Sequence, residues 1–179
     1  MKNSKTNFIV KVGVFSAIAF VLQVIGSLMA IKVAGFLEVE ISDLPAIIIA
    51  LAMGPWAGVC VELVKNLLHC TMSSTGLVGE LANFAVNGVF VFVCGMIYQY
   101  NKTKKGAVIS LLVATVVMAG ASILTNLFIM LPLYMPAVSF ADKLSLTLSV
   151  IAPFNLVRGA ALSVITMLIY KKISTLIKR

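Results

Sequence analysis

The stretch AVISLLVATVVMAGASILTNLFIML, residues 107–131, contains no charged side chain. An apolar run of about 20 residues is long enough to cross a bilayer as a helix. Over the whole chain of 179 residues, 61% are hydrophobic and 11% are charged, whereas soluble domains average about 45–50% and about 25%. A soluble fold of this length could not bury so much apolar surface. The composition therefore predicts an all-α integral membrane protein, with residues 1–179 forming one domain.

Other apolar runs lie on both sides of this stretch. They cover residues 8–30, 44–53, 56–70, 77–98 and 144–170. Residues 44–53 are too few to cross a bilayer alone, and Gly54-Pro55 separates them from 56–70, which predicts two short helices joined by a turn. With residues 107–131 included, the runs predict a compact bundle of six transmembrane helices.

The loop between the first two runs has a pattern of its own. Its apolar residues Leu37, Val39 and Ile41 alternate with the polar residues that follow each of them. A period of two is typical of a β-strand with one buried face. We therefore expect a short strand-like cap in the loop between helices 1 and 2.

Positive charge gathers in three places along the chain. Ten of the 14 basic residues lie within residues 2–11, 102–105 and 171–179, and all three clusters flank apolar runs. Cytoplasmic ends of membrane helices carry this excess of lysine and arginine. Six helices place all three clusters on one side, so we expect a multi-pass protein of the cell membrane with both termini in the cytoplasm. The net charge of +8 thus indicates topology and not a nucleic-acid partner.

Motifs for catalysis and metal binding are missing from the sequence. Its three cysteines form no C-x-x-C pair, which argues against a zinc site. It also lacks H-E-x-x-H, G-x-S-x-G and the P-loop pattern G-x-x-x-x-G-K-[ST]. We therefore expect neither an enzyme nor a resident cofactor or metal, and active transport by this chain would need energy from partner subunits.

Several polar side chains interrupt the apolar runs. The charged ones are Glu62, Lys65, Glu80 and Arg158, and the amides are Asn66, Asn83, Asn87, Asn126 and Asn155. A charge in the middle of a membrane helix costs about 2.5–3.5 kcal/mol on insertion scales, so such residues usually face a partner or a cavity. Polar groups that converge on one face of an apolar bundle are typical of a small-molecule pocket.

These residues also have structural explanations. Glu62 and Lys65 are three residues apart on one helix, so they can pair with each other. Glu80 is near a helix start, where a carboxylate complements the helix dipole. Asn155 and Arg158 share one helix face just after Pro153, and for these two we favour a role in a pocket.

Gly13 and Ala17 form a pair of small residues four apart on the first helix. Such a pair permits close approach of a second helix in a membrane. We expect these two residues to lie in a helix–helix contact with a partner.

Six segments of the chain form a recognisable series: SDLPA at 42–46, GPWAG at 54–58, VKNLLH at 64–69, GELANF at 79–84, Asn126 through LPLY at 131–134, and PFNLVRG at 153–159. In this order they resemble the S components of energy-coupling factor (ECF) vitamin transporters, most of all the riboflavin-specific ones. The resemblance extends from Gly13 to Gly159, nearly the full chain.

The resemblance implies a membrane pocket that opens outward and holds riboflavin, as transported ligand, beneath the loop between helices 1 and 2. The candidate ligand-binding residues are Asn126, Asn155, Arg158, Glu80, Asn83, Leu37 and Val39. Arg158 stands where the riboflavin members carry a lysine, and Gly13 stands where they carry an alanine. An arginine keeps the charge but presents it as a planar fork.

The resemblance also implies partners. Gly13 and Ala17 would dock onto a transmembrane scaffold subunit, and two cytoplasmic ATPase subunits would supply the energy. Two alternatives stay open: an S component for flavin mononucleotide or another vitamin, and a solitary proton-coupled carrier in which Glu62 or Glu80 titrates. A membrane enzyme acting on lipids would need an acidic metal cluster, which the isolated acids of this chain disfavour.

Overall fold

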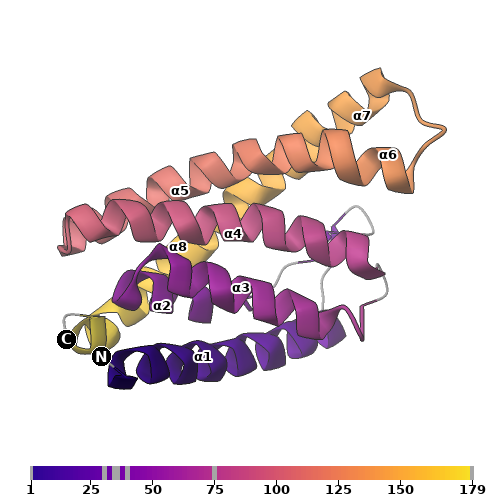
Figure 1. Ribbon diagram of the computed structural model, residues 1–179. Helices are drawn as coiled ribbons and strands as arrows, with labels where there is room; N and C mark the ends of the chain where they lie inside the picture. The colour runs from indigo at the N-terminus through magenta and orange to yellow at the C-terminus, as the bar shows by residue number, and fades with distance from the viewer. Residues whose placement is uncertain (1, 30–31, 34–36, 39–40, 74–75, 178–179) are drawn as a thin grey trace.

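The protein is an elongated bundle of helices, seen here in a computed structural model that describes residues 2–29, 32–33, 37–38, 41–73 and 76–177. The helices and strands are α1 (Lys2–Met29), β1 (Lys32–Val33), β2 (Leu37–Glu38), α2 (Leu44–Met53), α3 (Pro55–His69), α4 (Gly76–Tyr100), α5 (Lys104–Thr125), the π-helix η1 (Asn126–Met130), α6 (Leu131–Tyr134), α7 (Phe140–Leu146), the π-helix η2 (Thr147–Ile151) and α8 (Ala152–Ile177). Figure 1 shows both termini at one end of the bundle, while α6 and α7 project at the other end.

Within the residues that the structure describes, four helices are long and apolar enough to cross a membrane. They cover Lys5–Leu28, Leu77–Tyr100, Lys104–Tyr134 and Phe140–Tyr170. The sequence predicts six transmembrane helices, and the difference lies in α2 and α3, which are only 10 and 15 residues long. A tight turn joins α2 to α3, and each is shorter than the 18 or more residues of the four long helices.

The last two long helices extend further than their apolar runs predict. We expected helices over 107–131 and 144–170, but the helical segments run continuously over Lys104–Tyr134 and from Phe140 to Ile177. A proline inside a helix has no N–H to donate, and its ring crowds the preceding turn. Here a π-helical turn precedes each proline, η1 before Pro132 and η2 before Pro153. The wider π turn lets each helix continue through its proline.

The turn between α2 and α3 lies at Gly54, as the Gly-Pro pair predicts. Gly54 has φ of 103°, and a side chain there would meet Gln99 of α4. Nearly all of α2 is buried, including Ile47 and Ile49. Gly58 lets α3 approach α2 closely, because a Cβ placed on this glycine would lie only 2.7 Å from the Ala46 carbonyl oxygen. The short helix α2 is therefore a buried centre on which α1, α3, α4 and α8 pack.

The loop between α1 and α2 contains a pair of very short strands. β1 and β2 are antiparallel, with Lys32 opposite Glu38 and Val33 opposite Leu37. The alternation in the sequence predicts a longer strand-like segment through Ile41. Of the two candidate ligand residues in this loop, Leu37 lies in β2 and Val39 lies outside the described residues.

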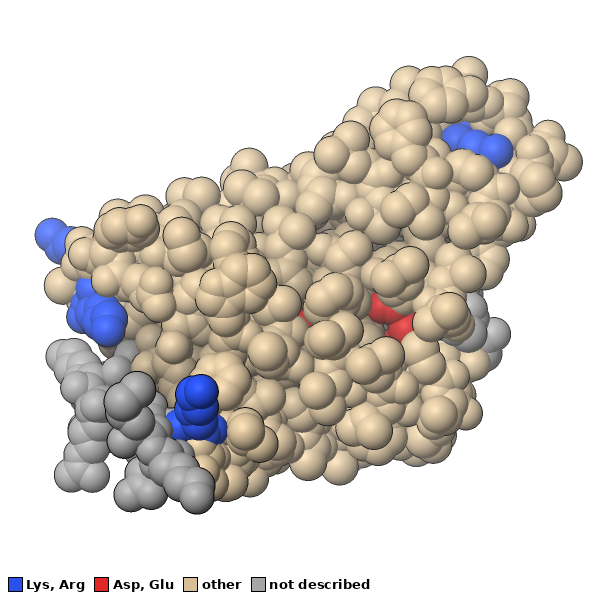
Figure 2. All heavy atoms as spheres, in the orientation of Figure 1, with Lys and Arg blue, Asp and Glu red and all other residues tan. Residues whose placement is uncertain are grey.

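The outer surface is mainly apolar. Exposed large hydrophobic side chains cover every long helix, among them Ile9, Val116, Phe128 and Leu168. In Figure 2 most of the basic side chains visible on this face lie at the end that carries the termini. An apolar girdle with cations at one end is the surface that a bilayer requires.

Candidate functional site

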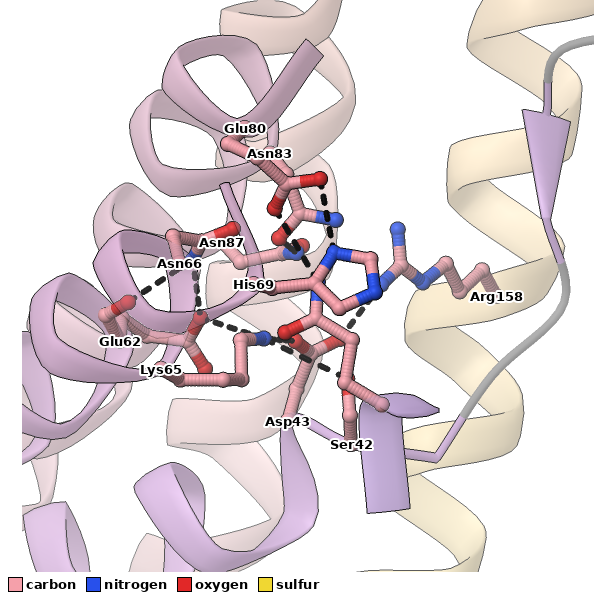
Figure 3. Close-up of polar contacts among 11 residues, drawn as sticks. Ser42, Asp43, Glu62, Lys65, Asn66, His69, Glu80, Asn83, Asn87 and Arg158 are labelled. Carbon is pink, nitrogen blue, oxygen red and sulfur yellow. Dashed lines mark hydrogen bonds and ion pairs between the residues drawn. The ribbon is translucent and has the colours of Figure 1, made fainter. Parts of the chain in front are cut away.

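Asp43 is the centre of a buried ionic network, drawn in Figure 3. It is the residue just before α2, and its carboxylate is fully buried. One oxygen, Oδ1, lies 2.6 Å from Lys65 Nζ of α3, and Oδ2 lies 2.7 Å from Arg158 Nη2 of α8. Burial raises the pKa of the Asp43 carboxyl, but the charges of Lys65 and Arg158 lower it more, so its pKa lies below the usual value.

Glu62 completes this network on α3. Its Oε2 lies 2.8 Å from Lys65 Nζ, and both side chains are fully buried. This contact confirms the pairing predicted from their spacing of three residues. The Asn66 amide donates to the Glu62 backbone carbonyl at 2.8 Å and so joins the same face of α3. We refer to Asp43, Glu62, Lys65 and Arg158 as the Asp43 network.

A second buried cluster joins α1, α3 and α4. Glu80 Oε1 lies 2.9 Å from His69 Nδ1, and Gln23 of α1 donates to Glu80 Oε2 at 3.2 Å. Ser27 of α1 lies 3.4 Å from the other ring nitrogen of His69. The sequence left open whether Glu80 complements the helix dipole or contacts a ligand, and in the structure side chains of two neighbouring helices bond its carboxylate.

The candidate amides lie on the inner faces of their helices. Asn87 donates to Asn83 Oδ1 at 2.9 Å, one turn along α4 from Glu80. Asn126 and Asn155 are both buried, and each donates to a backbone carbonyl four residues earlier, at 2.8 Å and 2.9 Å. Each therefore bonds its own helix, next to one of the two π turns.

The structure brings together part of the predicted site. Figure 3 places Glu80, Asn83 and Arg158 around one region, with Asp43 and His69 between them. Asn155 lies one turn before Arg158 on the buried face of α8.

Asp43, His69 and Gln23 were not predicted to belong to the site. The available signal for Asp43 was its position, directly before a fully apolar segment and within the quoted segment SDLPA. Gln23 is the single amide in the apolar run of residues 8–30, which is a weak signal alone.

Gly13 and Ala17 lie far along α1 from this region. Both are exposed, and a Cβ built on Gly13 meets no atom within 4 Å. They lie on an outer face of α1 with the exposed side chains Val10, Val14 and Val21. The pair of small residues is thus open to lipid or to a second protein.

Metal binding has little support in the described part of the chain. Among those residues, no group of three or more His, Cys, Asp or Glu side chains is placed to hold a metal ion. The acids of the site instead contact cations and amides of the protein itself.

The fold and the site define a polytopic membrane protein whose charged side chains meet in the interior of the bundle. A family model described as the ECF transporter, substrate-specific component, matches residues 7–170. The chain belongs to this family, as the six sequence segments indicated.

Individual proteins of this family are similar to the chain over nearly its whole length. The riboflavin transporter RibU of Staphylococcus aureus (strain TCH60) is 33% identical over 175 residues, which are 96% of this chain and 92% of that protein. The riboflavin transporter FmnP of Bacillus subtilis (strain 168) is 32% identical over 183 residues, 98% and 96% of the two chains. A structure titled "Structure and mechanism of the S component of a bacterial ECF transporter" superposes with a TM-score of 0.81 at 30% identity, covering 98% of this chain and 99% of that one.

Proposed function

We propose that this chain is the riboflavin-binding subunit of an ECF-type importer and holds the vitamin in a pocket that opens to the outside of the cell. The observation that carries the proposal is the near full-length similarity to two proteins named riboflavin transporters. The buried polar region supports it, because an apolar bundle gains nothing from burying such groups unless they bind something or each other.

The proposed ligand contacts are Asn126, Asn155, Arg158, Glu80 and Asn83, together with Leu37 and Val39 of the segment between α1 and α2. Asn155 and Asn126 each bond their own helix through the amide N–H, which fixes the side chain. An amide held in this way offers its oxygen as an acceptor, and the isoalloxazine ring carries an imide N–H. Arg158, one turn beyond Asn155, has five N–H donors in all and can bond a hydroxyl while it contacts Asp43.

The proposed topology places both termini in the cytoplasm. Both ends of the chain lie at one end of the bundle in Figure 1, and the basic turn Lys102–Lys105 connects α4 to α5. The Asp43 network lies at the α2 start, away from the chain ends. A cytoplasmic location of the lysines then leaves the network facing the outer side of the membrane.

The proposed partners are a transmembrane scaffold subunit and two cytoplasmic ATPases. The chain has no P-loop motif of its own, so an importer of this kind needs ATPase subunits. Gly13 and Ala17 lie on an exposed face of α1 where another helix can approach closely. We infer that the scaffold docks on this face.

Riboflavin fluorescence tests the proposed function directly. Ligand-free protein in detergent should quench riboflavin fluorescence saturably, at one ligand per chain. Replacing Asn155 by Ala should weaken binding by about tenfold, the equivalent of one buried hydrogen bond. Asn101→Ala is the matched control, because Asn101 is exposed at the basic end of the bundle. Folded protein that leaves riboflavin fluorescence unchanged would exclude riboflavin and direct the search to other vitamins.

A further inference from the structure

We propose that Asp43 makes the site select uncharged riboflavin over its phosphate monoester, flavin mononucleotide, by neutralising Arg158. This inference rests on the proposed function and concerns how the same site chooses its ligand. Arg158 alone would suggest the opposite selectivity, because a guanidinium is well suited to bind phosphate in a bidentate manner.

The position of Asp43 changes what Arg158 can do. Its Oδ2 lies 2.7 Å from Arg158 Nη2, and Asp43 is fully buried while the arginine side chain is only 10% exposed. Opposite charges at contact distance in such a shielded place interact far more strongly than they do in water. A phosphate would have to displace this carboxylate or approach it as a second anion.

Lys65, the other cation of the network, is likewise in contact with carboxylates. Its ammonium contacts Asp43 Oδ1 at 2.6 Å and Glu62 Oε2 at 2.8 Å. Each cation of the Asp43 network therefore has a carboxylate at contact distance. A second acid, Glu80, lies in the same region of Figure 3 and is held by His69.

A neutral ligand meets a different situation. The hydroxyl and carbonyl groups of riboflavin need hydrogen bonds but no countercharge. A guanidinium carries five N–H groups, so one that contacts a carboxylate can also bond a neutral oxygen. The arrangement thus favours hydrogen bonding to a neutral flavin and disfavours a dianionic phosphate.

The test compares the dissociation constants of flavin mononucleotide and riboflavin, both measured by fluorescence quenching. For the wild-type protein we expect a higher dissociation constant for the phosphate. Asp43→Asn keeps the shape of the side chain and removes its charge. The ratio of the dissociation constant of flavin mononucleotide to that of riboflavin should therefore fall by about tenfold or more. Asp142→Asn, at an exposed acid bonded to Ser139, is the matched control and should leave the ratio unchanged.

Opposite variants separate charge from shape. Arg158→Gln leaves Asp43 paired with Lys65 and should raise the ratio, while the double variant Asp43→Asn/Arg158→Gln should return it toward the wild-type value. If the phosphate group is excluded only by its size, the ratio will be the same in all variants, and the inference is overturned. It is also overturned if the wild-type protein binds flavin mononucleotide as tightly as riboflavin, a result that does not depend on whether Asp43→Asn folds. If neither flavin binds, the proposed function itself fails.

Discussion

The hydroxyl groups of Tyr98 and Tyr170 lie 2.9 Å apart, with their rings edge to face at a centroid distance of 6.4 Å. This contact ties α4 to α8 near the end of the bundle that carries the termini. The ionic contacts of Asp43 tie α2, α3 and α8 in the other half. The protein thus holds its helices together by buried polar contacts in both halves, which a membrane environment favours because hydrophobic burial alone does not drive helix association in lipid.

The tyrosine pair should behave as one unit. Tyr98→Phe and Tyr170→Phe each leave a buried hydroxyl without its partner, so each should lower the free energy of unfolding by about 1 kcal/mol. The double variant removes both hydroxyls and should lose clearly less than the sum of the two single losses. Thermal unfolding in detergent measures all three. Additive losses would mean that the two hydroxyls do not depend on each other.

Asp43 should matter more for stability than any exposed acid. Asp43→Ala removes the carboxylate that contacts both Lys65 and Arg158. Removing one member of a buried ionic contact typically costs about 3–5 kcal/mol. Apparent unfolding temperatures in detergent should show a large decrease, whereas Asp142→Ala, at an exposed acid, should change little. An unchanged unfolding temperature for Asp43→Ala would show that the network is dispensable.

The sequence predicted most of the helices because their signals are local. Apolar runs and the Gly54-Pro55 break depend only on neighbouring residues. The π turns before Pro132 and Pro153 were not predicted, since a change of helical register leaves the apolar pattern intact. For the same reason the sequence did not predict that these two helices extend beyond residues 107–131 and 144–170.

Among the contacts of the site, only the local one between Glu62 and Lys65 was predicted. Glu62 and Lys65 are one turn apart, so their pairing follows from spacing. Asp43 and Arg158 are separated by 115 residues, and no spacing in the sequence encodes that contact. It depends on how α2 and α8 pack, which the apolar pattern of either helix leaves undetermined.

Gly58 should be required for the packing of α3 on α2. A Cβ built on it would lie 2.7 Å from both the Ala46 carbonyl oxygen and the Ala50 Cβ. Gly58→Ala should therefore lower the free energy of unfolding by about 1–3 kcal/mol through overpacking. Gly120 on α5 is the matched control, because a Cβ there meets nothing within 4 Å. Gly120→Ala should be neutral or stabilising by up to about 1 kcal/mol, since alanine favours the helix.

The outer face of α1 should serve assembly and not ligand binding. Gly13 is exposed and has open space around it, so Gly13→Leu should leave folding and the riboflavin titration of the isolated chain unchanged. The added side chain should block a close helix–helix approach, and the chain should no longer co-purify with co-expressed scaffold and ATPase subunits. Gly120→Leu places the same side chain at another exposed glycine on α5 and should retain the complex. If Gly13→Leu still forms the complex, the scaffold does not dock through this face; if it also loses riboflavin binding, the face is not separate from the ligand site.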